Sequence, residues 1–184
     1  MPSKSIPEPW RSFLSDIDAT VTENVELHCV GGFVLTVLYD APRSTADVDV
    51  IAITPKTEIE PLMRLAEQGS ELHRKHKVYL QLVGVVTVPD TYEERLTEIF
   101  PGAFNHLRLL ALDPYDIALS KIERNNQRDR DDVRHLARTV PFDLITLKER
   151  YQNELRPYLS NPDREDLTLR LWMEAIEEER ALKL

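Results

Sequence analysis

The sequence has little cysteine and no long apolar run. Cys29 is the single cysteine, which excludes a disulfide framework and a zinc site built from cysteines. The longest apolar stretch, residues 30–39, falls short of the ~18 residues that a membrane crossing needs. Residues 1–10 contain one lysine with no apolar core behind it, so they do not resemble a signal peptide. We therefore expect a cytoplasmic protein with no membrane partner.

Basic residues are in the minority. There are 23 Lys and Arg against 32 Asp and Glu, which gives a net charge of −9. This acidic balance argues against a general nucleic-acid binder, and we expect no DNA partner. Two stretches, residues 72–77 and 121–138, are locally basic and could still line a groove for a phosphate backbone. Residues 73–77 are predicted to form a loop.

The order of the predicted elements indicates the fold class. With 184 residues and 42% hydrophobic content, the chain can form one domain or two small ones around a buried core. The predicted strands are residues 25–30, 47–53, 77–88 and 107–112. The predicted helices are residues 10–21, 33–39, 58–68, 92–100, 143–158 and 162–184. We predict an α/β (α+β) fold, with a small mixed sheet flanked by helices in residues 1–112 and a helical C-terminal bundle in residues 113–184.

Gly31 and Gly32 lie between a predicted strand and a predicted helix. Glycine at such a junction lets backbone N–H groups approach a ligand, and the N-terminus of the following helix attracts anions such as phosphate. Strand–glycine–helix turns are common in proteins, and most of them are purely structural. The pair therefore indicates a phosphate site only together with other features.

Asp47 and Asp49 open a predicted strand. Residues two apart on a strand point to the same face, so the two carboxylates would lie roughly 7 Å apart and repel each other. Such a pair is costly beside apolar neighbours unless water or a cation neutralises it. Mg²⁺ is commonly bound by one or two carboxylates together with substrate phosphates. The alternative is a solvated strand end that happens to carry two acids.

A charged stripe is predicted on a helix over residues 121–132. Lys121, Asn125, Arg128 and Asp132 share one face at helical spacing, whereas Asp129 shares the phase of the apolar residues. We expect Asp129 to be partly buried and to have a cationic partner. Taken alone, the stripe is more typical of a solvated face held by ion pairs than of a functional site.

In this order the motifs resemble the nucleotidyltransferase superfamily with the DNA polymerase β type of catalytic domain. The resemblance rests on Val30-Gly-Gly-Phe33 followed by Asp47-Val-Asp49. The segment from Lys121 to Asp132 resembles the AbiEii-type branch, which includes toxins and uncharacterised bacterial proteins. The resemblance spans roughly residues 25–140.

The resemblance implies a set of site residues and a reaction. Asp47 and Asp49 would hold Mg²⁺ or Mn²⁺, and Lys121 and Asp129 would complete the catalytic set. The implied nucleotide-binding residues are Gly31, Gly32, Arg43, Thr45, Arg128 and Asp132. Asp129 would act as a base or orient Lys121. The reaction would transfer a nucleoside monophosphate from an NTP such as ATP to a hydroxyl of RNA, for instance tRNA, or of a protein, and an antitoxin is a candidate partner.

One residue departs from the implied pattern. The family usually has a third carboxylate on a later strand, where this sequence has Gln81. A neutral amide can neither act as a general base nor supply a negative charge to a metal. Two alternatives therefore stand beside the enzyme. One is a catalytically degenerate member that binds a nucleotide or a partner, and the other is an interaction protein whose acidic C-terminal helices dock a basic partner.

Overall fold

The computed structural model describes residues 5–182 of the chain, which divides into two compact units. The first unit comprises the chain up to Gly84 together with Leu96–Leu112. The second comprises Val85–Arg95 and Asp113–Leu184. The segment Val85–Arg95 therefore belongs with the helical part, although the sequence patterns group it with the sheet. Within residues 5–182, no helix combines the length and apolar composition that a bilayer crossing needs.

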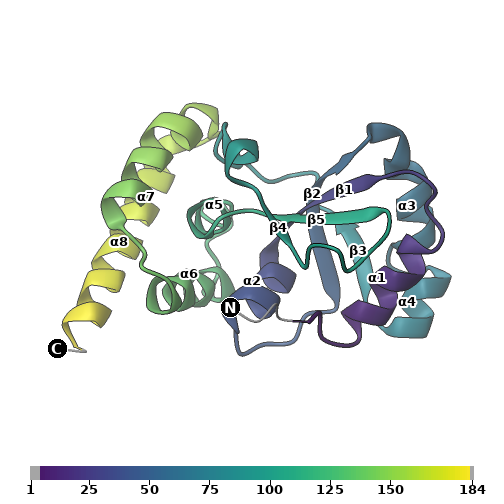
Figure 1. The fold of residues 1–184 in the computed structure, drawn as a ribbon. Helices are drawn as coiled ribbons and strands as arrows, with labels where there is room; N and C mark the ends of the chain where they lie inside the picture. Colours follow the sequence, from purple (N-terminus) through teal and green to yellow (C-terminus); the bar gives the residue numbers. More distant parts are fainter. Residues whose placement is uncertain (1–4, 183–184) are drawn as a thin grey trace. The chain divides into compact units, whose positions relative to one another are not determined.

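The first unit is built on a five-stranded mixed sheet with strand order β3-β2-β1-β5-β4 (Figure 1). Its strands are β1 (Val25–Val30), β2 (Asp47–Thr54), β3 (Tyr79–Leu82), β4 (Thr97–Ile99) and β5 (Leu107–Ala111). β1 is antiparallel to β2 and parallel to β5. β2 is parallel to β3, and β4 is antiparallel to β5. The fold is thus the mixed α/β sheet that the sequence predicts, with β3 at one edge.

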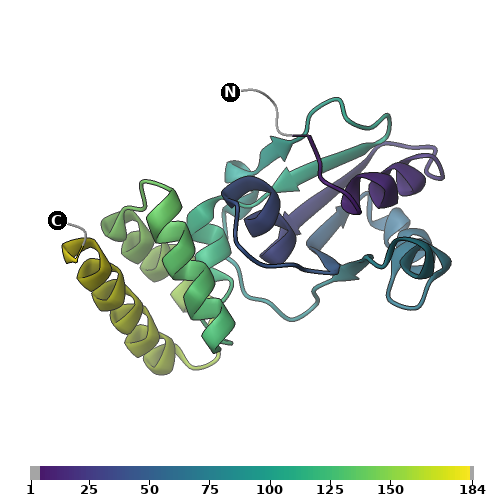
Figure 2. The same cartoon turned by 90° about the horizontal axis from the view of Figure 1, so that it is seen from below.

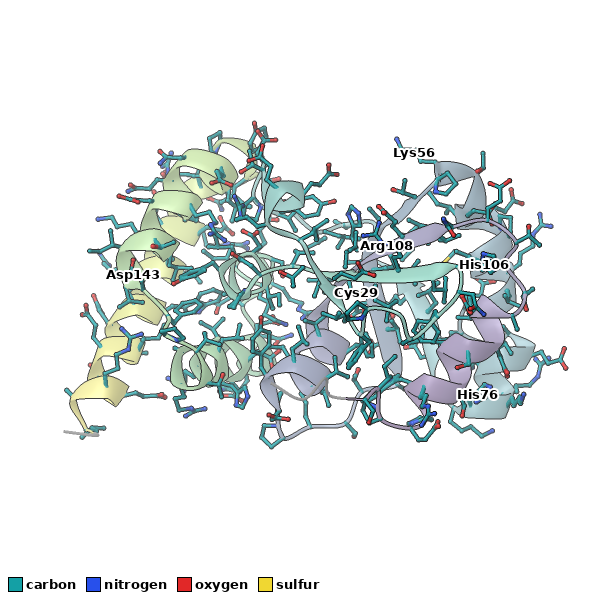
Figure 3. The ribbon with its side chains drawn as sticks, in the orientation of Figure 1. Cys29, Lys56, His76, His106, Arg108 and Asp143 are labelled. Atoms are coloured by element: carbon teal, nitrogen blue, oxygen red, sulfur yellow. The ribbon has the colours of Figure 1, made fainter. Side chains whose placement is uncertain are left out.

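The two faces of this sheet differ in chemistry because side chains alternate along each strand. The strand register brings buried apolar side chains together on one face, namely Val25, Leu27, Cys29, Val48, Val50, Leu80, Leu107 and Leu109. The other face carries polar residues. There Arg108, labelled in Figure 3, forms ion pairs with Glu26 and with Glu98, the latter at 3.1 Å. The second face is the one that carries Asp47 and Asp49.

Helices cover the apolar face (Figure 2). They are α1 (Trp10–Asp18), α2 (Gly31–Tyr39), α3 (Ile59–Ala66), which follows a 3₁₀ turn at Lys56–Glu58, and α4 (Glu71–His76). α1 buries Phe13, Leu14 and Ile17, which lie on one side at helical spacing. At its end Asp18 accepts the backbone N–H groups of residues 105–107 at 2.7–2.9 Å, which fixes the entry to β5.

The second unit is helical. It contains a 3₁₀ turn at Tyr92–Arg95, then α5 (Pro114–Leu119), α6 (Gln127–Thr139), α7 (Leu144–Arg150) and α8 (Pro162–Ala181). α7 continues through a π turn at Tyr151–Leu155 and a 3₁₀ turn at Arg156–Tyr158. Arg95 donates to Asp116 at 2.9 and 3.1 Å and to Glu154 at 2.7 Å. Because Asp116 is fully buried, this ionic network attaches Val85–Arg95 firmly to the helices.

Four sequence predictions of local structure are wrong. Residues 77–88 form only the short strand β3, and the helix predicted at 92–100 is a 3₁₀ turn followed by β4. The stretch predicted to loop at 73–77 lies mostly in α4, which Ser70 caps by accepting the N–H of His73. The helix predicted through 121–132 is interrupted, because Asn125 has a left-handed backbone (φ 41) and Asn126 caps a new helix, α6.

Candidate functional site

Asp47 and Asp49 lie on the polar face of β2, at the start of the strand. They alternate with Val48 and Val50, which are fully buried against the helices, and both acids are half-buried. The strand geometry therefore places both carboxylates on one face, roughly 7 Å apart. The acid pair lies beside the end of β1, since Val30 is the register partner of Asp49.

The glycine pair approaches the acid pair closely. Gly31 has a positive φ of 72°, and a Cβ added there would collide with the carboxylate of Asp49. A Cβ on Gly32 would lie 2.7 Å from Nη2 of Arg43 and 3.3 Å from Cβ of Thr45. Gly31 is therefore required by its backbone conformation and by the nearby carboxylate, whereas a side chain at Gly32 would displace the flexible end of Arg43.

The loop between α2 and β2 is fixed by its own hydrogen bonds. Thr36 on α2 donates to the backbone carbonyl of Arg43 at 3.3 Å. The hydroxyl of Thr45 donates to Oδ1 of Asp47. Among the described residues no side chain caps the N-terminus of α2, which begins at Gly31. The first N–H groups of a helix have no partner within the helix, so this end is suited to an anion.

The strand β3 borders the acid pair on its other side. In the parallel register Tyr79 lies beside Asp47, and Gln81 lies beside Asp49. Gln81 is exposed and shares the face of the two acids, at the position where the family resemblance implies a third carboxylate. Sequence reasoning missed Tyr79, because only the strand register shows that it neighbours Asp47.

These groups fit a divalent cation that is also bound by a substrate. Two carboxylates and an amide oxygen on one face match the hard oxygen ligands of Mg²⁺, which usually retains water and binds substrate phosphates. In the described part of the chain no group of three or more His, Cys, Asp or Glu side chains could hold a metal ion. Asp47, Asp49 and Gln81 could supply part of a coordination shell, which phosphate oxygens would complete.

Cys29 lies on the opposite, helix-covered face of β1. Its thiol is fully buried, and burial together with the negative charge of Asp49 raises its pKa to about 12. A thiol with such a pKa stays protonated at neutral pH and is a poor nucleophile or metal ligand. Cys29 is thus a core residue and takes no part in the chemistry of the polar face.

The second unit contains an ionic cluster in which Lys121, Asp129 and Asp132 are buried and Arg124 is exposed. Nζ of Lys121 lies 2.9 Å from Asp132 and 3.6 Å from Asp129. Arg124 donates to both carboxylate oxygens of Asp129, at 2.6 and 2.8 Å. Lys121 is 4% exposed and Asp129 is 0% exposed. Two cations thus face two carboxylates in this cluster.

Asp129 is held in its charged form. Burial alone would raise its pKa, but the hydrogen bonds from Arg124 and the charge of Lys121 outweigh that effect and lower it. Its carboxylate also accepts the backbone N–H of Asn126 in a reciprocal capping box. This confirms that Asp129 is buried beside a cation, as its apolar phase predicts. A lowered pKa and full burial suit the orienting of Lys121 better than proton abstraction.

The predicted site residues thus form two groups. Gly31, Gly32, Arg43, Thr45, Asp47 and Asp49 gather in the first unit. Lys121, Asp129 and Asp132 gather in the second unit, whereas Arg128 is exposed on α6. The participation of the second group in one site with the first stays a prediction.

Comparison with known proteins gives one match. A family model described as a nucleotidyltransferase of unknown function (DUF6036) matches residues 12–180. No curated protein and no solved structure matches the chain. The matched range includes the glycine pair, the acid pair and the ionic cluster.

Proposed function

Since the chain belongs to this family of nucleotidyltransferases of unknown function, we propose that it transfers a nucleoside monophosphate from an NTP to a hydroxyl group in a Mg²⁺-dependent reaction. One observation supports the proposal most strongly. The carboxylate of Asp49 lies so close to Gly31 that no side chain fits there, which joins a cation-binding acid pair to an anion-binding helix end.

Asp47 and Asp49 would hold Mg²⁺ in this reaction. When bound, the ion supplies charge stabilisation for the attacking and leaving oxygens of an in-line displacement. Thr45 orients Asp47 through its hydroxyl. The N–H groups at the start of α2 and the guanidinium of Arg43 beside Gly32 bind phosphate oxygens. The glycines, Arg43 and Thr45 thereby position the triphosphate against the two carboxylates.

The proposed bond changes are those of nucleotidyl transfer. The acceptor hydroxyl oxygen bonds to the α-phosphorus, the bond from that phosphorus to the bridging oxygen breaks, and pyrophosphate leaves. The proton of the hydroxyl passes to solvent water, because the amide of Gln81 cannot take it. Lys121 would neutralise charge on the triphosphate, oriented by Asp129, and Arg128 and Asp132 keep their predicted nucleotide-binding roles within the proposal.

The acceptor classes that we propose are the hydroxyls of RNA, such as tRNA, and of proteins. The basic residues of α4 favour RNA, and the net charge of −9 favours a protein. A role as the toxin of a toxin–antitoxin pair is part of the same proposal. It predicts slowed growth on expression of the wild type and normal growth with Asp49→Ala.

A second candidate function is nucleotide binding without turnover. It is favoured by Gln81, which lies in register with Asp49 where the family usually has a third carboxylate. In this case the acid pair and the glycine pair would still bind Mg²⁺ and an NTP, but no labelled product would form.

Thermal unfolding with Mg²⁺ and each NTP tests nucleotide binding, and transfer of label from an α-labelled NTP tests turnover. Ligand at ~100 times its Kd stabilises the fold by about 2.7 kcal/mol, which raises the midpoint by several degrees. We expect a Mg²⁺-dependent shift that is lost in the Asp47→Ala/Asp49→Ala variant. A shift without any labelled product supports binding alone, and no shift with any NTP contradicts both functions.

A further inference from the structure

The edge strand β3 places two uncharged, planar side chains beside the acid pair. Tyr79 is the register partner of Asp47, and Gln81 is the register partner of Asp49. Because paired residues of parallel strands share a face, all four side chains lie on the polar side of the sheet. β2 is the only neighbour of β3 in the sheet order, so the flank of β3 away from Asp47 is not covered by another strand of the described chain.

The ring of Tyr79 is held in a fixed orientation. The imidazole of His73 packs against it edge to face, with ring centroids 5.1 Å apart and planes at 76°. His73 is itself fixed, because its Nδ1 accepts the N–H of Gly69 at 2.9 Å and its backbone N–H caps α4 through Ser70. A ring whose orientation is set by its neighbours loses little conformational freedom when a ligand stacks on it.

Gln81 complements this ring chemically. Its exposed side chain offers both hydrogen-bond donors and an acceptor, which a carboxylate at the same position could not do. An aromatic face two residues from an amide is suited to a flat heterocycle with polar edges. Bases stack on aromatic side chains and are hydrogen-bonded at their edges in many nucleic-acid sites.

We propose that Tyr79 and Gln81 form a nucleobase-binding surface at the β3 edge, with Tyr79 as the stacking platform and Gln81 as the hydrogen-bonding partner. The proposal rests on the nucleotidyl-transfer function above, because it places the base next to the acids that would hold the metal-bound phosphates. It also gives a role to Gln81, which stands where the family usually has a third carboxylate. In this proposal β3 binds a base instead of contributing charge to a metal. The base comes either from the NTP or from the end of a nucleic-acid acceptor.

The first arm of the test compares an NTP with tripolyphosphate, which has the phosphates but no base. Wild type, Tyr79→Ala, Tyr79→Phe and Gln81→Leu are titrated with each ligand in the presence of Mg²⁺, and Kd is taken from thermal shifts. If the surface binds the base of the NTP, Tyr79→Ala weakens NTP binding by about tenfold or more. Tripolyphosphate binding stays unchanged in that case, and Tyr79→Phe keeps wild-type affinity for both ligands.

The second arm measures binding of short labelled oligoadenylate and oligocytidylate by fluorescence anisotropy. If the surface binds the acceptor base, Tyr79→Ala weakens oligonucleotide binding by about tenfold while NTP binding is unchanged. Tyr158→Ala serves as the control, because Tyr158 is an exposed tyrosine (58%) of the second unit. Urea melts of each variant without ligand show that the fold is intact.

The outcomes separate this proposal from the function it rests on. If Tyr79→Ala changes neither NTP nor oligonucleotide binding, the nucleobase surface is overturned even when Mg²⁺-tripolyphosphate binds. If wild type binds neither NTP nor tripolyphosphate, the proposed function fails at its phosphate site. In that case a Tyr79-dependent oligonucleotide affinity would still support the surface, and its absence would overturn both.

Discussion

The two units of this chain each contain a pair of acids, and the pairs are built differently. Asp47 and Asp49 are half-buried on the polar face of the sheet, and Asp47 accepts a hydrogen bond from the uncharged hydroxyl of Thr45. Asp129 and Asp132 are buried beside Lys121, with a second cation, Arg124, bound to Asp129 in a bidentate pair. The second pair lies beside two cations of its own unit, and the first pair is the one that we propose to bind a metal ion.

This comparison shows that residue type alone does not reveal a role. Asp-x-Asp on a strand places two like charges on one face, where a bound cation is favoured. An acid with a bidentate arginine is a charge-assisted contact within the fold, and removal of one partner leaves a buried charge uncompensated. We therefore expect the first pair to matter most for chemistry and the second most for stability.

The largest expected effect is on transfer by Asp49→Ala. The loss of a metal ligand removes several kcal/mol of transition-state stabilisation, so labelled transfer should fall by about 10³-fold or more. The free energy of unfolding should change by about 1 kcal/mol or less, because the residue lies outside the apolar core. Glu26→Ala is the matched control, since Glu26 is an acid on the same face that pairs with Arg108. Equal loss of activity in both variants would contradict the assignment.

Asp129→Ala should affect stability more than transfer, which is the reverse of the result expected for Asp49→Ala. Its removal takes one of two carboxylates from buried Lys121 and breaks the capping box with Asn126, which should lower the free energy of unfolding by about 1–3 kcal/mol. Urea denaturation measures the change. Asp131→Ala, at an exposed position of the same helix, should stay within about 0.5 kcal/mol of wild type. A stable Asp129→Ala variant that has lost transfer would show instead that the second acid pair is catalytic.

Gly31→Ala should affect both stability and nucleotide binding, since Gly31 adjoins Asp49 and has a left-handed backbone. We expect a loss of about 1–3 kcal/mol in unfolding free energy from strain, together with displacement of Asp49 and weaker Mg²⁺-NTP binding. Gly84→Ala is the control, because a Cβ there meets nothing within 4 Å. If Gly31→Ala binds Mg²⁺-NTP like wild type, the close approach of Gly31 to Asp49 does not matter for the site.

The sequence predicts the first acid pair more fully than the second because its signals are local. The strands at 25–30 and 47–53 alternate strongly, and the glycines and acids lie at their ends, so one strand pairing brings them together. The ionic cluster depends on a helix break at Asn125 and Asn126, which helical periodicity across 121–132 does not reveal.

Other features depend on contacts between distant residues. β4 has three residues, two of them exposed, and it exists because it pairs with β5. No local pattern distinguishes such a strand from the end of a helix. Tyr79 likewise becomes a neighbour of Asp47 only through the register of β2 and β3. Sequence reasoning therefore found the elements with strong periodicity and missed those that tertiary pairing creates.

The smallest expected effect tests whether an acid stabilises the fold because of the unit in which it lies or because of the groups that bind it. Asp18 is a buried acid of the first unit; burial raises its pKa, but the N–H groups of residues 105–107 outweigh this and lower it. A lowered folded pKa means that this stabilisation is present above the ordinary carboxyl pKa of 3.8 and is lost as pH falls through the folded pKa. In urea melts, wild type should therefore exceed Asp18→Asn most at pH of about 5–6, and the difference should shrink as the pH falls below 3.8. A difference that is constant with pH would mean that Asp18 acts through its shape instead of its charge. In that case the hydrogen-bond partners of an acid would not explain why buried acids differ from Asp47 and Asp49.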